Sequence, residues 1–300
     1  MAVDMNLYAL PEGCIANALS LTSPKDACRL SLVASTFRSA AQSDAVWDRF
    51  LPADYQDILA RSKEGLELLR SLESKKQLYL HLCDHPILID DATKSFSLEK
   101  GSGKKCYMLA AKDLMIVWGD TPRYWRWVSM PESRFPTVAE LLDVCWFEIR
   151  GKIQTSMLSP NTTYSASLVF TTKSRTYGFD YQPAETSVAI GGEESQTRAV
   201  YLDSEGAQRH NYQIIPRWRT GSFQRRNAVI RRPETESTEH QDAQLPKQRR
   251  DRWMEIELGE FFVKEGQDVE VVMSLLEVKA GNWKSGLIVE GIEIRPKVDN

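Results

Sequence analysis

The sequence predicts an α+β multidomain chain in which a short helical region precedes an antiparallel β-sandwich. Apolar residues recur at helical spacing as far as about residue 83, and beyond about residue 104 they alternate with polar residues. A length of 300 residues suits about two domains. Hydrophobic side chains make up 42% of the chain, which is enough for a core of ordinary size.

Residues 10–50 predict three short helices. The second has a clear start, because Ser23 can cap it, Pro24 suits the first helical position and Asp26 can complete a capping box. Its expected apolar face consists of residues at helical spacing: Ala27, Leu30, Val33, Ala34 and Phe37. A shorter helix precedes it, and Ser43 can cap the last one. About forty residues bury little surface by themselves, so we expect the apolar side of this unit to need a partner.

The expected organisation is one unit over 1–53, a helical linker over 54–103 and a β-sandwich over 104–297. The sandwich is predicted because several short alternating segments follow one another with turn residues between them. Residues 219–250 interrupt this pattern with clustered charge and few apolar residues, which predicts a disordered insertion. The basic pairs of this insertion fit either a nuclear-import signal or a solvated loop.

Composition argues against several classes of partner. The net charge of −3 gives no reason to expect nucleic acid, and no apolar run reaches the roughly 18 residues that a membrane span needs. The N-terminal residues do not look like a signal peptide. Five scattered cysteines without a CxxC pair fit reduced thiols better than a disulfide framework. We therefore expect a protein of the cytoplasm and nucleus.

No motif predicts catalysis, a cofactor or a metal. His81 and His85 flank possible ligands but match no zinc spacing. The segment 101–105 lacks the order of residues that a phosphate-binding loop requires. Glu255 and Glu257 could be imagined as the paired carboxylates of a glycosidase, but on an alternating strand they are expected to form an outward polar face.

A tryptophan-rich segment is the main candidate for ligand binding. Residues 118–127 contain Trp118, Trp125 and Trp127 directly after an alternating apolar run. An indole offers both a large apolar area and a flat π-face, so the cluster fits either a core or a platform on which a sugar ring can stack. A stacking tryptophan must show a face to solvent, whereas a core tryptophan must not.

Residues 10–52 resemble an F-box. The resemblance lies in Leu10-Pro11-Glu12, in Ser23-Pro24-Lys25-Asp26-Ala27-Cys28-Arg29-Leu30 and in Val46-Trp47-Asp48-Arg49-Phe50-Leu51-Pro52. It implies docking on the Skp adaptor of a Skp–cullin–F-box ubiquitin ligase, which would supply the partner that the helices need. The adaptor contacts that it implies are Leu10, Pro11, Ile15, Leu19, Pro24, Leu30, Val33 and Trp47. The last of these fits either an interface anchor or a core residue.

Residues 104–297 resemble the plant phloem-lectin (Nictaba-like) family. The matching segments are 111–118, 124–127, 140–146, 253–262 and 283–296. The resemblance implies a jelly-roll-like sandwich that binds oligosaccharides, typically N-acetylglucosamine oligomers or N-glycans, through Trp118 and Trp125. Trp127 shares a face with Trp125 on an extended strand and fits the core. Trp283 and Lys284 are secondary candidates for structural or ligand contacts.

The two resemblances together suggest a plant F-box–lectin protein. Such a chain would be a non-catalytic adaptor that brings glycoproteins to a ubiquitin ligase. One alternative is an adaptor for protein targets whose lectin-like domain has lost sugar binding. Another is a free carbohydrate-binding stress lectin with a vestigial F-box.

Overall fold

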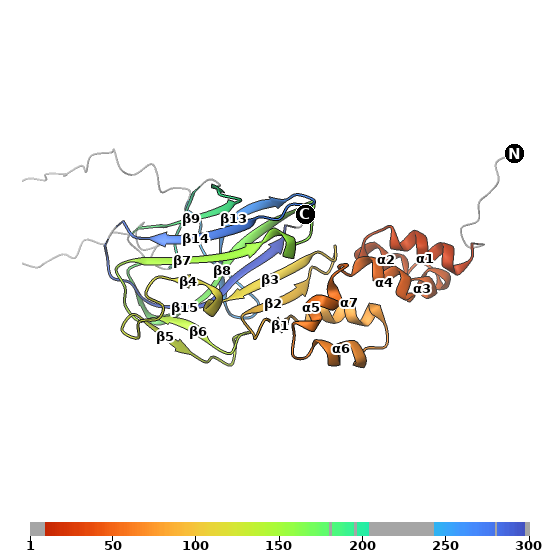
Figure 1. Cartoon of the computed structure of the whole chain (residues 1–300), viewed down its shortest axis with the longest axis horizontal. Helices are drawn as coiled ribbons and strands as arrows, with labels where there is room; N and C mark the ends of the chain where they lie inside the picture. The colour runs from red at the N-terminus through yellow and green to blue at the C-terminus, as the bar shows by residue number, and fades with distance from the viewer. Residues whose placement is uncertain (1–9, 180–181, 195–196, 204–242, 280, 298–300) are drawn as a thin grey trace, which may run out of the picture.

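The computed structural model describes residues 10–179, 182–194, 197–203, 243–279 and 281–297. Helices form one end of an elongated molecule, and two layered antiparallel sheets form the other (Figure 1). The predicted fold class is confirmed. The helices of the described part of the chain are α1 (Glu12–Ser20), α2 (Pro24–Leu30), α3 (Ser35–Ala40), α4 (Asp44–Phe50), α5 (Tyr55–Ala60), α6 (Gly65–Ser71) and α7 (Lys75–Asp84).

The helix expected over residues 24–37 is divided into α2 and α3. Its start is as predicted: Ser23 Oγ accepts a hydrogen bond from the Asp26 backbone N–H, and Pro24 occupies the first turn. Ala34 is fully extended and ends the helical run. The intervening segment 31–34 contains serine and valine, which have low helix propensity, and this favours the break. The unit thus has four helices rather than three.

Asp44 connects this unit to the next helices. Ser43 precedes α4 as expected, but its side chain makes no capping bond. Asp44 instead directs a carboxylate oxygen at the Lys75 backbone N–H, 2.9 Å away, at the N-terminus of α7. A carboxylate in this position accepts a hydrogen bond from an otherwise unpaired N–H and interacts favourably with the positive end of the helix dipole. One acidic side chain therefore joins α4 to α7.

The expected helical linker ends earlier than residue 103. After α7 the chain forms β1 (Ile87–Ile89) and β2 (Lys94–Leu98), which pair with each other and with β3 (Lys105–Ala110). The sheet thus begins within the predicted linker. Ion pairs hold the helices against it, with Lys105 Nζ 2.7 Å from Asp54 and Arg61 in a bidentate contact with Asp90.

Together with β1, β2 and β3, the remaining strands form two sheets. They are β4 (Met115–Ile116), β5 (Trp125–Val128), β6 (Val138–Leu141), β7 (Phe147–Gln154), β8 (Thr162–Tyr177), β9 (Ala184–Ile190), β10 (Glu193–Glu194), β11 (Arg198–Val200), β12 (Lys247–Gln248), β13 (Met254–Val263), β14 (Glu270–Glu277) and β15 (Ser285–Pro296). One sheet has the order β1-β2-β3-β15-β8-β13-β12, with β6 also on β15 and β5 on β6. The other has the order β10-β9-β14-β7-β4, with β11 on β9.

The main core lies between the sheets and continues into the helices. A smaller cluster on the outer face of the larger sheet includes Met108, Phe135 and Trp253. The segment that contains Phe135 covers this cluster, because Glu290 on β15 accepts hydrogen bonds from the Arg134 backbone N–H and the Ser133 hydroxyl. Burial raises the pKa of Glu290.

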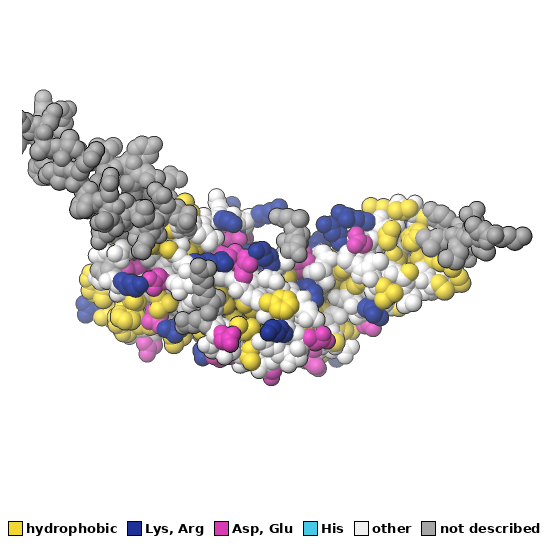
Figure 2. All heavy atoms as spheres, turned by 90° about the horizontal axis from the view of Figure 1, so that it is seen from above, with side chains coloured by type: hydrophobic (Ala, Val, Ile, Leu, Met, Phe, Trp, Pro, Cys, Tyr) yellow, Lys and Arg dark blue, Asp and Glu magenta, His cyan; other side chains and the backbone are white. Residues whose placement is uncertain are grey.

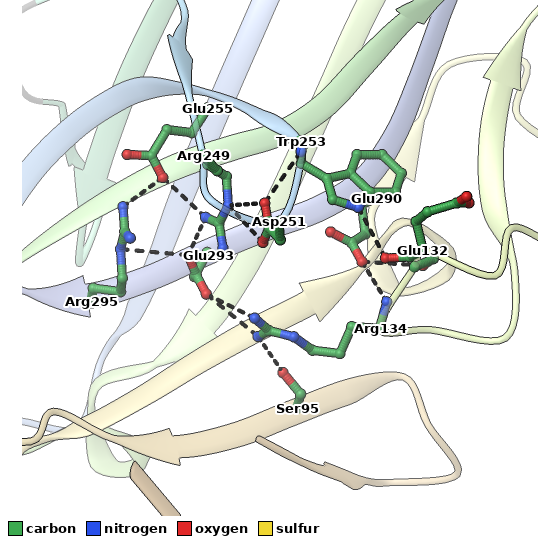
Figure 3. Close-up of polar contacts among 11 residues, drawn as sticks. Ser95, Glu132, Arg134, Arg249, Asp251, Trp253, Glu255, Glu290, Glu293 and Arg295 are labelled. Atoms are coloured by element: carbon green, nitrogen blue, oxygen red, sulfur yellow. Dashed lines mark hydrogen bonds and ion pairs between the residues drawn. The ribbon is translucent and has the colours of Figure 1, made fainter. Parts of the chain in front are cut away.

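Of the predicted insertion over 219–250, residues 219–242 lie outside the described residues. Its end is described and is ordered into the sheet, because Lys247 and Gln248 form β12 on β13. Arg249 is mostly buried and contacts Asp251, Glu255 and Glu293 (Figure 3). The expectation of a solvated loop is therefore wrong for Arg249.

The same network controls the ionisation of Glu293. Burial alone would raise the pKa of Glu293, but the guanidinium groups of Arg249, Arg295 and Arg134 hold it below its usual value. Arg249 thus acts as a structural cation that fastens the end of the insertion to β15 (Figure 3).

A buried ion pair lies at the end of the sandwich away from the helices. Lys284 and Glu277 are in direct contact, and neither side chain is appreciably exposed. Lys284 Nζ also donates to the Asn282 and Cys145 carbonyls at 2.7 and 3.3 Å. Its backbone exchanges two hydrogen bonds with Val144. Lys284 therefore joins the segment before β15 to the segment before β7.

Removal of one member of this pair should destabilise the sandwich strongly. We expect Lys284→Met to lower the free energy of unfolding by about 3–5 kcal/mol, because it leaves the Glu277 carboxylate buried without its cation. The double variant Lys284→Met/Glu277→Leu should recover a large part of this loss. Urea denaturation followed by tryptophan fluorescence measures both. A double variant as unstable as Lys284→Met would contradict this account.

Candidate functional site

The end of the sandwich opposite the helices carries several exposed aromatic residues. Strand β3 starts at Lys105, which contacts Asp54 beside the helices, so its other end at Ala110 lies away from them. The chain continues from there through β4 into the loop 117–124. The starts of β7 and β15 and the end of β8 reach the same end of the sandwich (Figure 1). Exposed aromatic residues in these segments are Trp118, Trp127, Trp146, Tyr177 and Trp283.

Two indole groups of β5 hold the loop 117–124 in place. Trp125 Nε1 donates to the Val117 carbonyl at 3.2 Å, and Trp127 Nε1 donates to the Gly119 carbonyl at 3.1 Å. Both side chains can reach the loop because alternate residues of a strand project to the same side. The Thr121 backbone N–H adds a bond to the Trp118 carbonyl inside the loop. Trp125 and Trp127 thus fix the loop from both sides of Trp118.

Trp118 is held as a presented ring at the start of this loop. Its φ of 59° lies in the left-handed region, which a bulky side chain adopts only where its surroundings impose it. The ring packs on Tyr124 with centroids 5.1 Å apart, and 39% of the residue is exposed. Trp118 therefore has a fixed orientation and a solvent-facing surface, which a stacking platform requires.

Trp125 is a core residue and not a platform. Only 2% of it is exposed, and its ring stacks on Phe147 with centroids 6.3 Å apart. The ring has no face left for a ligand, so the expectation of a direct sugar contact at Trp125 is corrected. Trp127 was expected in the core, but it is 36% exposed. Strand alternation predicts a shared side but not which position along the strand is covered.

A hollow of about 500 Å³ adjoins this loop. Its lining is mixed in character and comprises Lys112, Leu114, Met115, Ile116, Gly119, Asp120 and Trp127. The Lys112 ammonium lies 5.9 Å from the centre of the Trp127 ring, and the Arg123 guanidinium lies 5.8 Å from that of Tyr124. Rings, cations and a carboxylate thus occur together here, a combination that can stack on an apolar ligand face and bond to its hydroxyl groups.

The residues expected to contact the Skp adaptor divide into two sets. Leu10, Pro11 and Val33 are exposed and remain candidates for that contact. The others are half-buried (Leu30) or buried (Ile15, Leu19, Pro24 and Trp47). The buried set forms the core of the helical unit, so a direct contact of these residues is not supported. Two exposed leucines, Leu21 and Leu32, were missed because they lie in turns, where helical spacing does not apply.

Trp47 illustrates this correction. Its indole N–H donates to the Ala41 carbonyl at 2.8 Å, and its ring contacts Phe50 and Tyr79. The Lys76 ammonium lies 5.4 Å from the ring centre. Contacts from Ala41 after α3, from its own helix α4 and from α7 therefore enclose Trp47, which joins the F-box-like helices to α7.

The carboxylates of Glu255 and Glu257 both have cationic partners. Glu255 contacts Arg249 and Arg295, and Glu257 contacts Arg198. In the part of the chain that the structure describes, no group of three acidic, histidine or cysteine side chains could hold a metal ion. No described helix is long and apolar enough to cross a bilayer.

Two family models match the chain. The model of Phloem protein 2 matches residues 104–296, and that of the F-box domain matches residues 7–49. The F-box protein At2g02240 of Arabidopsis thaliana is 49% identical over 96% of this chain and 79% of that protein. The F-box protein PP2-B1 of the same plant is 44% identical over 97% and 90%.

Among solved structures, the GH26-CBM35 mannanase of Podospora anserina aligns with 65% of this chain and 28% of its own. The TM-score of 0.32 and the 7% identity are too low to carry an argument. The two family models cover residues 7–49 and 104–296, and these relatives align with 96–97% of the chain. The chain therefore belongs to the family of F-box proteins that carry a Phloem protein 2 domain.

Proposed function

We propose that this protein is the substrate-recognition subunit of a Skp–cullin–F-box ubiquitin ligase and that its sandwich binds glycans on target glycoproteins. The observation that carries the proposal is the placement of two different surfaces at opposite ends of the molecule. Exposed apolar side chains lie before and between the F-box helices, and a presented aromatic ring lies at the far end of the sandwich.

The F-box end supports the adaptor contact through its exposed apolar side chains. Leu10, Leu21, Leu32 and Val33 are all exposed, although leucine and valine usually lie inside a protein. Figure 2 shows hydrophobic side chains gathered over this end of the molecule. A small helical unit with such a surface is suited to binding another protein.

The sandwich end supports glycan binding through Trp118. A sugar ring can stack its C–H face on the indole, and the neighbouring Lys112, Asp120 and Arg123 can bond to hydroxyl groups. Trp125 and Trp127 support this contact indirectly, because their indole N–H groups bond to the loop that carries Trp118. The protein would break no bond itself, since its role is to hold the target near the ligase and so raise the effective concentration. We place this function in the cytoplasm and nucleus.

Binding to the Skp adaptor should depend on the exposed residues between α2 and α3. We expect Leu32→Asp/Val33→Asp to weaken the complex about tenfold or more, because charges would replace apolar contacts at the interface. Leu66→Asp, on the exposed side of α6, is the matched control and should bind as the native protein does. Pull-down and calorimetry with purified Skp adaptor measure the effect. Full affinity of the double variant, or no complex with native protein, would refute the adaptor proposal.

Glycan binding should separate the two roles of the tryptophans. On a glycan array, Trp118→Ala should abolish binding and lower thermal stability only slightly, because it removes a partly exposed ring that packs on Tyr124. Trp125→Phe retains the ring contact with Phe147 but loses the bond to the Val117 carbonyl, so it should reduce binding about tenfold or less. Phe262→Ala, an exposed aromatic position on β13, should have no effect.

The burial of Trp125 favours one competing function, an adaptor that recognises protein targets through a domain without sugar binding. The same array decides between the two. An absence of any bound glycan with native protein would leave this second function in place of the first.

A further inference from the structure

We propose that Trp283, Tyr177 and Asp143 form a second sugar-contacting surface, which acts together with Trp118 on one extended, uncharged oligosaccharide. This inference rests on the proposed glycan binding and names the class of ligand. The three residues come from three separate segments: the start of β15, the end of β8 and the segment after β6. We call them the Trp283 surface.

The two aromatic residues of the Trp283 surface are exposed, and Asp143 beside them is half-buried. Trp283 is 46% exposed and Tyr177 is 49% exposed. The Tyr177 hydroxyl donates a hydrogen bond to Asp143 Oδ1 at 2.7 Å. Exposed aromatic rings beside a fixed carboxylate offer a stacking face and hydrogen-bond acceptors, which are the two kinds of contact that a sugar uses.

Gly178 allows the two aromatic segments to meet. Its φ of 87° is in the left-handed region, and a Cβ there would lie 2.1 Å from the Trp283 carbonyl oxygen. Only glycine fits such a close approach. The backbone after Tyr177 is therefore packed directly on the backbone of Trp283.

The buried residue Lys284 holds the segments of this surface together. Its backbone pairs with Val144, which is next to Asp143, and its own neighbour is Trp283. Its ammonium reaches the carbonyls of Asn282 and Cys145 as well as the Glu277 carboxylate. The buried ion pair thus holds Asp143 and Trp283 in one arrangement before any ligand binds, which lowers the entropic cost of binding.

A backbone hydrogen bond links the segment of Asp143 to the loop of Trp118. The Tyr124 carbonyl, beside the Trp118 ring, accepts a hydrogen bond from the Leu142 backbone N–H at 2.9 Å. Leu142 directly precedes Asp143. From Tyr124 across the β6 segment and β15 to Tyr177 there are three strand-to-strand steps, or about 14 Å. A single sugar ring cannot span this distance, whereas an oligosaccharide chain can.

The charge of Asp143 selects the ligand class. Its carboxylate can accept hydrogen bonds from sugar hydroxyls but would repel a uronic acid, sulfate or sialic acid group. An uncharged oligosaccharide therefore fits this surface best. The ring of Trp118 and the ring of Trp283 would contact different residues of the same chain.

Calorimetry with the full-length protein and two probes tests this inference. The probes are the disaccharide and the hexasaccharide of N-acetylglucosamine, which are uncharged and differ in length. Native protein should bind the hexasaccharide more tightly. Trp283→Ala and Asp143→Ala should each weaken hexasaccharide binding about tenfold and leave disaccharide binding within about twofold of native. Trp118→Ala should weaken both, and Phe262→Ala neither.

Each contrary result has a separate meaning. Unchanged hexasaccharide affinity in Trp283→Ala, with native protein binding both probes, would overturn the second surface and leave the proposed function intact. Equal weakening of both probes, with an unchanged melting temperature, would overturn it also, because the residue would then belong to the Trp118 site. If native protein binds neither probe, and no glycan on the array, the proposed function itself fails.

Discussion

The rest of the sandwich depends on the central strand β15, which pairs with β3, β6 and β8. This arrangement brings backbones unusually close, because a Cβ at Gly291 would lie 2.0 Å from the Leu109 carbonyl oxygen. The same strand carries Glu290 and Glu293, which hold the segments that cover its outer face (Figure 3). Its start follows Trp283 and Lys284, so the packing of one strand positions both the polar network and the candidate second surface.

Polar groups in the interior of this protein act as fasteners between segments that are distant in the chain. Arg249 joins the end of the insertion to β15, and Lys284 joins the segments before β7 and β15. A buried charge is tolerated only with a partner, so each contact fixes the position of both segments that contribute to it. Such contacts suit a binding domain, since loops that are already ordered lose little entropy when a ligand arrives.

The tryptophans of the cluster have different roles at one site, which depend on how deeply each is buried. Trp125 is enclosed against Phe147 and donates its indole N–H to the loop, whereas Trp118 projects from that loop. Trp127 does both, because it holds Gly119 and still exposes part of its ring. The loss of a buried tryptophan can therefore weaken ligand binding without any direct contact.

Local sequence patterns determined the α+β organisation, the two family resemblances and the start of α2, because periodicity, caps and motifs are properties of neighbouring residues. Only the tertiary structure decided which tryptophans face solvent, since burial depends on strands that are far apart in the chain. It also placed Ile15, Leu19 and Trp47 in the core and joined β1 and β2 to the sheet. The Trp283 surface arises in the same way, because Asp143, Tyr177 and Trp283 meet only through strand pairing and the fit at Gly178.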